Sequence, residues 1–434
     1  MSIESLYSIY LKYPLICTDS RTIQKGCIFF ALKGENFNGN LFAATALEQG
    51  ASYAVIDEKS SGKEGDKRFI VVENVLNALQ KLANHHRRQL TIPFIAITGS
   101  NGKTTTKELV RNILSQKFRT HATKGNLNNH IGVPLTILSM SASTEIAVIE
   151  MGANHLLEIK TLCEIAEPDY GIITNIGKAH LEGFGGFEGV KKGKGELYDF
   201  MAIKNKTIFL NADNVHLIEM ANERRIGTRI TYGASHECNC RGHLQTATPF
   251  VKIRWEYEEQ KSEVSSQLIG LYNYENILAA ICIGSYFGVE PKLVNNAIEE
   301  YVPDNSRSQV IQKGSNTIIL DAYNANPTSV AAALRHFNGT DAKRKIIFLG
   351  DMAELGADSV KEHAAIIELL KQVKADEVVL VGNNFKPFAD QLDCHYFDSS
   401  IAAADWLTSH KFENSAILIK GSRSMKMEKV LEGI

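Results

Sequence analysis

The sequence lacks the features that would suit a membrane, a disulfide-stapled scaffold or a nucleic-acid surface. No apolar run approaches the roughly 18 residues that a membrane span needs. The seven cysteines are odd in number and mostly scattered, which favours a reducing cytoplasm over a disulfide framework. Its 47 basic and 49 acidic residues give a formal charge of −2, so electrostatics offers no basis for binding nucleic acid or anionic lipid.

Two further local patterns bear on the class of protein. The first residues lack a basic stretch followed by an apolar core, so we expect no secretory signal. A short group of potential zinc ligands lies mid-chain, but its spacing matches no common zinc motif. We interpret it as a polar turn between strands, with a metal site as the lesser alternative; its members are His236, Cys238, Cys240 and His243.

Hydrophobic periodicity divides the 434 residues into three segments. The N-terminal segment, 1–92, alternates short strands with helices and predicts a small mixed α/β domain. The central segment, 93–303, has near-continuous apolar strands separated by helices, which indicates a buried parallel sheet. An alternating stretch at 251–257 predicts a one-sided antiparallel appendage. The C-terminal segment, 304–434, restarts the alternation as a smaller doubly wound, Rossmann-like domain.

Individual elements follow from the same patterns. Helices are expected at 75–89, 274–286 and 359–373. Central strands are expected at 94–97, 146–149, 171–174 and 207–210, and C-terminal strands at 317–320, 345–349, 378–381 and 416–419.

The most informative stretch joins the strand at 94–97 to a helical pattern. It has the glycines, lysine and threonine of a phosphate-binding loop, placed between strand and helix as that loop requires. Backbone N–H groups would cradle phosphates, Lys103 would add charge, and the Thr104 hydroxyl could ligate Mg²⁺. Ile97 stands where the full motif has its first glycine, so a purely structural turn is the alternative. The loop comprises Gly99, Ser100, Asn101, Gly102, Lys103, Thr104 and Thr105.

Polar residues follow other predicted strands, at the sheet edge where open parallel sheets bind ligands. Glu150 could hold Mg²⁺ or merely cap the next helix, and His180 could ligate a second metal or lie on plain surface. Lys194 lies in a basic stretch that reads as a solvated turn or a phosphate contact. The run 321–327 could contact ribose hydroxyls or a peptide backbone, or form an Asx turn that caps the helix after Pro327. The run 420–423 could bind an anion or a carboxylate.

Together these residues resemble the Mur ligases, over essentially the whole chain. The motifs that carry the resemblance are Thr98–Thr104, Gly125–Asn129 with Gly132–Pro134, Glu150–Ala153, Thr174–Gly177 with Ala179–Glu182, Lys194–Glu196, Asn273 with Asn276, Asp321–Pro327, Gly350–Gly356 and Lys420–Arg423. The resemblance implies three domains, with an ATPase domain of parallel strands in the centre. It also implies a monomer in a bacterial cytoplasm.

The resemblance also implies roles for particular residues. Lys103, Thr104 and Glu150 would bind phosphate and Mg²⁺, and His180 would help hold a second Mg²⁺. Lys194 would be carbamylated by CO₂ and so become a metal ligand. Further nucleotide contacts would come from Asn273, Asn276, Arg307 and Asp321. Substrate contacts would come from Ser20, Arg21, Asn126, Asn129, Asn324 and Asn326, with the turn 38–40 also near the uridine nucleotide.

Among Mur ligases, the loop Tyr323–Pro327 points to the member that uses ATP to join D-alanyl-D-alanine to UDP-N-acetylmuramoyl-tripeptide through an acyl phosphate, in peptidoglycan precursor synthesis. The alternatives are a sister ligase that adds a single amino acid and a ligase like folylpolyglutamate synthase. A P-loop kinase or nucleotide switch is more remote, because neither explains Lys194 beside His180. Whether the tripeptide ends in lysine or diaminopimelate stays open.

Overall fold

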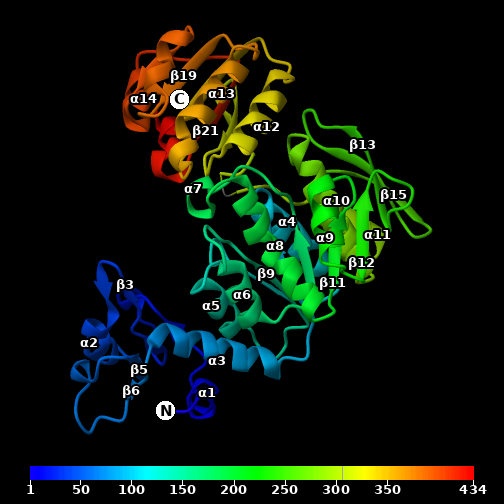
Figure 1. The fold of residues 1–434 in the computed structure, drawn as a ribbon. Coiled ribbons are helices and arrows are strands. Elements are labelled where there is room, and N and C mark those ends of the chain that lie inside the picture. Colours follow the sequence, from blue (N-terminus) through cyan, green and yellow to red (C-terminus); the bar gives the residue numbers. More distant parts are fainter. Residues whose placement is uncertain (305) are drawn as a thin grey trace. The chain divides into compact units, whose positions relative to one another are not determined.

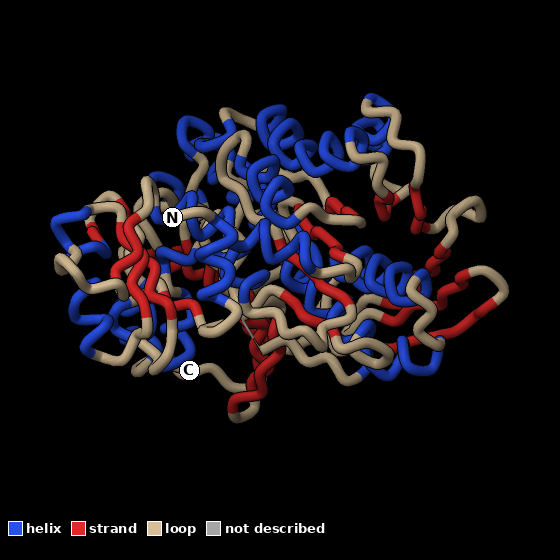
Figure 2. The backbone as a smooth tube through the Cα atoms, turned by 90° about the horizontal axis from the view of Figure 1, so that it is seen from below, coloured by secondary structure: helices blue, strands red, loops and turns tan. Residues whose placement is uncertain are grey.

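The computed structural model describes residues 1–304 and 306–434. Contacts divide them into two compact units, and both units mix helices with strands (Figures 1 and 2). The first unit holds 1–97, 118–153 and 157–171, and the second holds 98–117, 154–156 and 172–434. The α/β class expected from the sequence is therefore confirmed. No helix within the described ranges is long and apolar enough to cross a membrane.

The first unit begins with a small parallel sheet of order β1-β2-β5-β6. Its strands are β1 (Ile16–Cys17), β2 (Ile28–Phe30), β5 (Tyr53–Ile56) and β6 (Phe69–Val71). The helices are α1 (Ile3–Tyr10), α2 (Ala43–Glu48) and α3 (Val75–Gln89), the last as predicted. A two-stranded ribbon and three short 3₁₀ turns complete this part: β3 (Lys33–Gly34), β4 (Phe37–Asn38), η1 (Ser20–Thr22), η2 (Gly39–Phe42) and η3 (Lys59–Ser61).

The rest of the first unit carries three parallel strands in the order β8-β9-β7. Every residue of β7 and β9 is buried, as expected for strands covered on both faces. The elements are β7 (Phe94–Thr98), β8 (Thr120–Ala122), α5 (Gly132–Leu138), β9 (Ile146–Glu150) and α6 (Glu158–Ala166).

The second unit begins with the helix after the phosphate-binding loop, followed by strands in the order β10 to β15. Strands β11, β12 and β13 pair in parallel, whereas β13, β14 and β15 are antiparallel, which confirms the appendage predicted at 251–257. The strands are β10 (Tyr170–Ile173), β11 (Thr207–Asn211), β12 (Arg229–Gly233), β13 (Cys240–Thr246), β14 (Lys252–Tyr257) and β15 (Gln260–Ser265). The helices are α4 (Lys103–Leu114), α7 (Leu181–Phe184), α8 (Phe187–Ile203), α9 (Val215–Glu223), α10 (Tyr272–Tyr286) and α11 (Pro291–Glu299).

The second unit also contains a six-stranded C-terminal sheet of order β16-β17-β21-β18-β19-β20. Only β16 runs antiparallel to its neighbour, so the rest has the doubly wound character predicted. Its strands are β16 (Gln309–Lys313), β17 (Asn316–Asp321), β18 (Arg344–Gly350), β19 (Glu377–Val381), β20 (His395–Phe397) and β21 (Ser415–Lys420).

Helices and 3₁₀ turns cover the C-terminal sheet, with α12 and α13 side by side (Figure 1). The core on the face covered by α14 and η7 includes Ile318, Phe348, Val379 and Ile417, all without exposed surface. These elements are α12 (Pro327–Asn338), α13 (Ser359–Leu370), α14 (Ser400–Leu407), η4 (Gly356–Asp358), η5 (Lys386–Gln391), η6 (Arg423–Met425) and η7 (Met427–Glu432). Helix α13 ends three residues before the predicted end at 373.

Candidate active site

The phosphate-binding loop lies between β7 and α4, as predicted. Gly99 and Gly102 have φ of +140° and +78°, in the range that favours glycine. A Cβ on Gly99 would lie 2.1 Å from Thr174 Oγ1, and one on Gly102 would lie 2.3 Å from Asn276 Oδ1. Both glycines are therefore required by backbone conformation and by close approach.

Hydrogen bonds pin this loop to the segment that follows β10. The backbone N–H of Ser100 donates to the Asn175 carbonyl (3.0 Å), and that of Asn101 donates to Asn175 Oδ1 (2.9 Å). The Thr174 hydroxyl donates to the Asn101 carbonyl at 2.6 Å. Ser100 Oγ also exchanges hydrogen bonds with the backbone of Gly177. The loop is thus preorganised by groups about 75 residues away in sequence.

Lys103 is the first residue of α4, and its ammonium folds back over the loop. Nζ donates to the Gly99 carbonyl at 2.8 Å and to the Ser100 carbonyl at 3.2 Å. Thr104 and Thr105 follow in the first helical turn and are buried. A positive side chain at a helix N-terminus that follows a glycine turn is an anion-binding arrangement.

The two asparagines expected near adenine lie on α10, behind the loop. Asn276 Nδ2 donates to Asn273 Oδ1 at 2.9 Å, and Asn276 Oδ1 accepts from the Thr106 hydroxyl at 3.2 Å. Asn273 Nδ2 donates to the Ile269 carbonyl at 2.8 Å. This network fixes α10 against α4, and the adenine contact itself stays a prediction.

Glu150 ends β9 in the first unit and is 1% exposed. Its Oε1 accepts from Asn128 Nδ2 at 2.7 Å, and its backbone N–H donates to the Thr123 hydroxyl at 3.0 Å. Asn129 Oδ1 accepts the backbone N–H groups of Ile131 and Gly132 at the start of α5. Asn126, the other predicted substrate contact of this loop, is exposed.

His180 immediately precedes α7, and Lys194 lies on α8. Lys194 is fully buried, with Nζ 5.0 Å from the centroid of the Phe184 ring. A Cβ on Gly193 would lie 2.3 Å from Phe184 Cε1, so α7 rests directly on this turn of α8. His180 Nδ1 lies 2.5 Å from Glu354 Oε2, and the proximity of His180 lowers the pKa of the Glu354 carboxyl.

The second unit also brings the loop after β17 to the phosphate-binding loop. Asn326 Nδ2 donates to Asn101 Oδ1 at 2.8 Å. Asn326 also caps α12, because its Oδ1 accepts from the Ser329 backbone at 2.9 Å. The neighbouring Asn324 accepts the Ala325 N–H. The capping turn proposed as an alternative is therefore present alongside the contact with the loop.

Asp321 and Arg307, predicted to meet the nucleotide, have partners within the second unit. Asp321 Oδ2 lies 2.6 Å from Nζ of Lys420, which is buried, and Oδ1 accepts from the Ser308 backbone at 3.3 Å. The Arg307 guanidinium lies 3.6 Å from the centroid of the Tyr323 ring, a cation–π geometry. Arg307 thus lies against the loop 321–327, which Asp321 begins.

The residues predicted near the uridine nucleotide lie in the first unit. Arg21 is exposed and pairs with Asp19 at 2.7 Å, and this hydrogen bond lowers the pKa of Asp19 to about 2. Ser20 begins the short turn η1.

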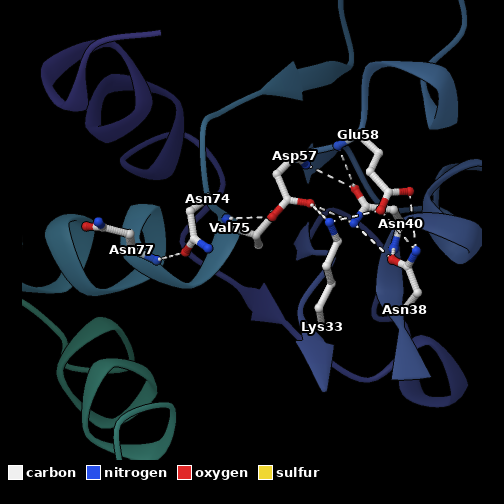
Figure 3. A network of polar contacts seen from close by, with 8 residues as sticks. All are labelled: Lys33, Asn38, Asn40, Asp57, Glu58, Asn74, Val75 and Asn77. Carbon is white, nitrogen blue, oxygen red and sulfur yellow. Dashed lines mark hydrogen bonds and ion pairs between the residues drawn. The ribbon is translucent and has the colours of Figure 1, made fainter. Parts of the chain in front are cut away.

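The turn 38–40 belongs to a polar network that is drawn in Figure 3. Lys33 Nζ lies 2.9 Å from carboxylate oxygens of both Asp57 and Glu58. Asn40 Nδ2 donates to Asn38 and Asp57, and its Oδ1 accepts the backbone N–H groups of Asp57 and Glu58. The hydrogen-bonding capacity of Asn40 is filled inside the unit, so this side chain positions the turn.

The group of His236, Cys238, Cys240 and His243 lies between β12 and β13 and at the start of β13. Over residues 1–304 and 306–434, no three His, Cys, Asp or Glu side chains are grouped so that they could hold a metal ion.

Comparison with known proteins identifies the family to which this chain is similar. Three family models match in chain order: "Mur ligase family, catalytic domain" at 12–87, "Mur ligase middle domain" at 97–284, and "Mur ligase, glutamate ligase domain" at 306–423. A UDP-N-acetylmuramoyl-tripeptide–D-alanyl-D-alanine ligase of Bacillus subtilis is 32% identical, over 96% of this chain and 92% of its own length. The chain belongs to the Mur ligase family.

Solved Mur ligases share the fold. A MurF structure from Acinetobacter baumannii matches with a TM-score of 0.87 and 30% identity, over 96% of this chain and 92% of that one. MurF from Thermotoga maritima, solved in complex with ADP, matches with a TM-score of 0.85 and 26% identity, over 98% and 97%.

Sequence reasoning missed the partners of several site residues in this Mur ligase. Asn128, which holds Glu150, lies within a run that carried the resemblance but received no role. Glu354, which holds His180, lies in the run Gly350–Gly356 and was also unassigned. Lys420 was predicted to belong to an anion or carboxylate site, and its ammonium pairs with the Asp321 carboxylate, a partner that the sequence did not identify. The signal available was membership of a motif, and the motif does not identify the partner.

Proposed function

We propose that this Mur ligase uses ATP to join D-alanyl-D-alanine to the tripeptide carboxylate of UDP-N-acetylmuramoyl-tripeptide. The observation that carries the proposal is the phosphate-binding loop, with Lys103 folded over its carbonyls at the start of α4. The choice of substrates is supported by the relatives that align with about the whole chain. Those from B. subtilis, Haemophilus influenzae and Escherichia coli are named for this reaction and are 32%, 34% and 32% identical.

The chemistry follows from the poor reactivity of a carboxylate. A carboxylate oxygen attacks the γ-phosphorus of ATP, the bond to the β–γ bridging oxygen breaks, and ADP leaves with that oxygen. The dipeptide amine then attacks the acyl phosphate carbon and loses a proton, and the tetrahedral intermediate expels phosphate. The α4 N-terminus and Lys103 stabilise charge on the transferred group, so the protein acts mainly by positioning and electrostatics.

The residues present suit magnesium. Glu150 is a buried carboxylate, and buried carboxylates are paired or coordinate metals. Thr104 offers a hydroxyl in the first turn of α4, and His180 offers a ring nitrogen. We propose that Thr104, Glu150, His180 and carbamylated Lys194 hold two Mg²⁺ ions with the nucleotide. When bound, Mg²⁺ offsets negative charge on the phosphates.

Carbamylation of Lys194 is proposed on the chemistry of its position. Its side chain is fully buried on α8, where a charged ammonium is costly to desolvate. Addition of CO₂ to the neutral amine converts it to an anionic oxygen donor and releases a proton. The lysine then supplies the type of ligand that magnesium prefers.

An acyl phosphate is hydrolysed by water, so the site must close during the reaction. We propose that the C-terminal domain, 304–434, closes onto the central domain during the reaction. Closure would bring Asp321 to the nucleotide, with Arg307, Asn324 and Asn326 also facing nucleotide and dipeptide. The contact of Asn326 with Asn101 supports this closure.

Adenine would meet Asn273 and Asn276, and the uridine nucleotide would meet Ser20 and Arg21. Asn126 and Asn129 would contact the muramyl tripeptide. We further propose that the enzyme acts as a monomer in the bacterial cytoplasm.

The test measures phosphate release from ATP with UDP-N-acetylmuramoyl-tripeptide, with and without D-alanyl-D-alanine, while product mass is read in parallel. Tripeptides ending in lysine and in diaminopimelate are compared. Dipeptide-dependent phosphate and a product heavier by one dipeptide, less water, are expected. Phosphate release that ignores the dipeptide but responds to a single amino acid would overturn the proposal in favour of a sister ligase. A phosphorylated product without an amide bond would favour a kinase.

A further inference from the structure

Two loops far apart in sequence meet at His180 and Glu354. His180 Nδ1 lies 2.5 Å from Glu354 Oε2. The backbone reinforces this contact, because the Glu182 N–H donates to the Glu354 carbonyl at 3.1 Å. Gly356 approaches the same turn so closely that its Cβ would lie 3.1 Å from Cβ and Cγ of Glu182. The loop after β18 is therefore fitted to the turn that carries His180 by side chain, backbone and close packing.

Both partners hold an unusual backbone conformation. His180 has φ of +53° and Glu354 has φ of +62°, in the left-handed region that side chains rarely adopt. Such conformations cost free energy and persist where the surrounding structure imposes them, often at functional sites. An ordinary surface ion pair needs no strain in either partner. Here the strain brings one carboxylate oxygen to one ring nitrogen.

The contact selects between the two nitrogens of the imidazole. A ring nitrogen that holds a lone pair is repelled by a carboxylate oxygen at 2.5 Å, so the nitrogen beside Glu354 carries the proton. In the neutral ring the other nitrogen then holds the lone pair. Nδ1 faces Glu354, which leaves Nε2 as the nitrogen that can ligate a metal. Histidines that bind metals are oriented in this way by a carboxylate or carbonyl.

We propose that Glu354 is a positioning residue that fixes the proton of His180 on Nδ1 and presents Nε2 to the magnesium–nucleotide complex. This inference rests on the proposed function, because it assumes that His180 faces the metal. It gives the loop 350–356 a defined role, in which the C-terminal sheet supplies the carboxylate that prepares a ligand carried on the turn before α7. The metal site is then complete only when this loop is docked.

A second ion pair in the same unit provides an internal control. Lys178 Nζ lies 2.6 Å from Glu362 Oε1, with the lysine 45% and the glutamate 4% exposed. Lys178 lies two residues before His180, and Glu362 lies on α13, so this pair also ties the turn before α7 to the C-terminal sheet. It leaves the imidazole untouched. Its loss should weaken docking without changing which nitrogen of His180 carries the proton.

The experiment compares wild type, Glu354→Ala, Glu354→Gln and Lys178→Met, each checked for an unchanged unfolding transition. The full chain is labelled with ¹⁵N in its 13 histidines, and a His180→Gln sample identifies the signals of that ring. Long-range ¹⁵N–¹H spectra without nucleotide report the tautomer. Mn²⁺ binding in the presence of ADP is measured by electron paramagnetic resonance.

We expect wild type and Lys178→Met to carry the proton on Nδ1. Glu354→Ala should shift it toward Nε2 and weaken Mn²⁺ binding about 10- to 100-fold, the usual effect of removing such a partner. Glu354→Gln keeps an acceptor oxygen and should recover part of both properties. An unchanged tautomer in Glu354→Ala, or an equal loss of Mn²⁺ affinity in Lys178→Met, would overturn the inference.

These readouts separate the inference from the proposed function. If wild type binds Mn²⁺ with ADP and shows the expected tautomer but forms no dipeptide adduct, the substrate proposal fails and the role of Glu354 stands. If dipeptide ligation is normal in wild type and in Glu354→Ala with the tautomer unchanged, the role of Glu354 fails and the function stands.

Discussion

The side-chain amide of Asn326 donates a 2.8 Å hydrogen bond to Oδ1 of Asn101, which lies 225 positions earlier in the chain. The same side chain caps α12 through its carbonyl oxygen, which accepts from the Ser329 backbone. Asn326 therefore caps α12, a helix beside the C-terminal sheet, and also contacts the phosphate-binding loop. The two interactions use different atoms, so substitutions can separate them.

Asn326→Ser should keep the cap and lose the contact with Asn101, because serine is also a good N-cap residue but is too short to span the gap. We expect near-normal urea unfolding and a kcat/KM for ATP lowered about 5-fold, the effect of one neutral hydrogen bond of about 1 kcal/mol. Asn326→Ala loses both and should also be destabilised by about 1 kcal/mol. Equal activity of Asn326→Ser and wild type would show that the contact has no role in turnover.

Gly102→Ala should abolish measurable ADP binding in calorimetry, because the new Cβ would lie 2.3 Å from Asn276 Oδ1 at a φ of +78°. Gly26→Ala is the matched control: its φ is +86°, but nothing lies within 4 Å of the new Cβ. The control should lose about 1–2 kcal/mol of folding free energy from backbone strain and still bind ADP. Comparable ADP affinity in the two variants would refute the steric argument.

Lys194→Met should lower kcat about 100- to 1,000-fold, as removal of an electrostatic group from a reaction centre does. Methionine suits the buried position, so the unfolding transition should remain cooperative. Lys191→Met, on the same helix, removes a lysine that pairs with Glu219 and should leave kcat unchanged. Full activity of Lys194→Met would exclude a carbamate at this position.

Protonation of His363 should destabilise the fold in mild acid. Burial lowers its pKa, and its Nε2 accepts the Met352 N–H at 3.1 Å while Nδ1 lies 2.8 Å from the Ser359 carbonyl. Between the folded pKa and the unfolded value near 6.5, the unfolded chain binds more protons, so stability falls as pH decreases through that window. We expect the urea concentration at the midpoint of unfolding to be lower at pH 5.5 than at pH 7.5.

His363→Asn should be less stable than wild type at pH 7.5 and should lose less stability on acidification. The exposed His410→Asn serves as the control and should keep the wild-type pH dependence. Burial also lowers the pKa of His86, His121 and His336, so part of the slope should persist in His363→Asn. An identical slope in His363→Asn and wild type would contradict the assignment.

Sequence patterns predicted the elements whose residues are consecutive and strongly apolar. The strands at 94–97, 146–149, 317–320 and 345–349 lie within β7, β9, β17 and β18, because buried parallel strands read as unbroken hydrophobic runs. Strands β16 and β20 were not predicted. Gln309–Lys313 mixes polar and apolar residues at the edge of the sheet, and His395–Phe397 is too short to show a period.

The position of the phosphate-binding loop was determined by the sequence alone, because its glycines, Lys103 and the start of the helix are consecutive in the chain. Its hydrogen bonds to Thr174 and Asn175 were decided by tertiary structure. The pairs His180–Glu354, Asn101–Asn326 and Lys178–Glu362 were decided by tertiary structure. Each joins residues more than 170 positions apart. Their meeting depends on the order and register of β17, β21 and β18, which deliver the loops that follow them to one edge of the C-terminal sheet. Local periodicity in the sequence does not predict that register, because the register is set only when strands distant in the sequence pair.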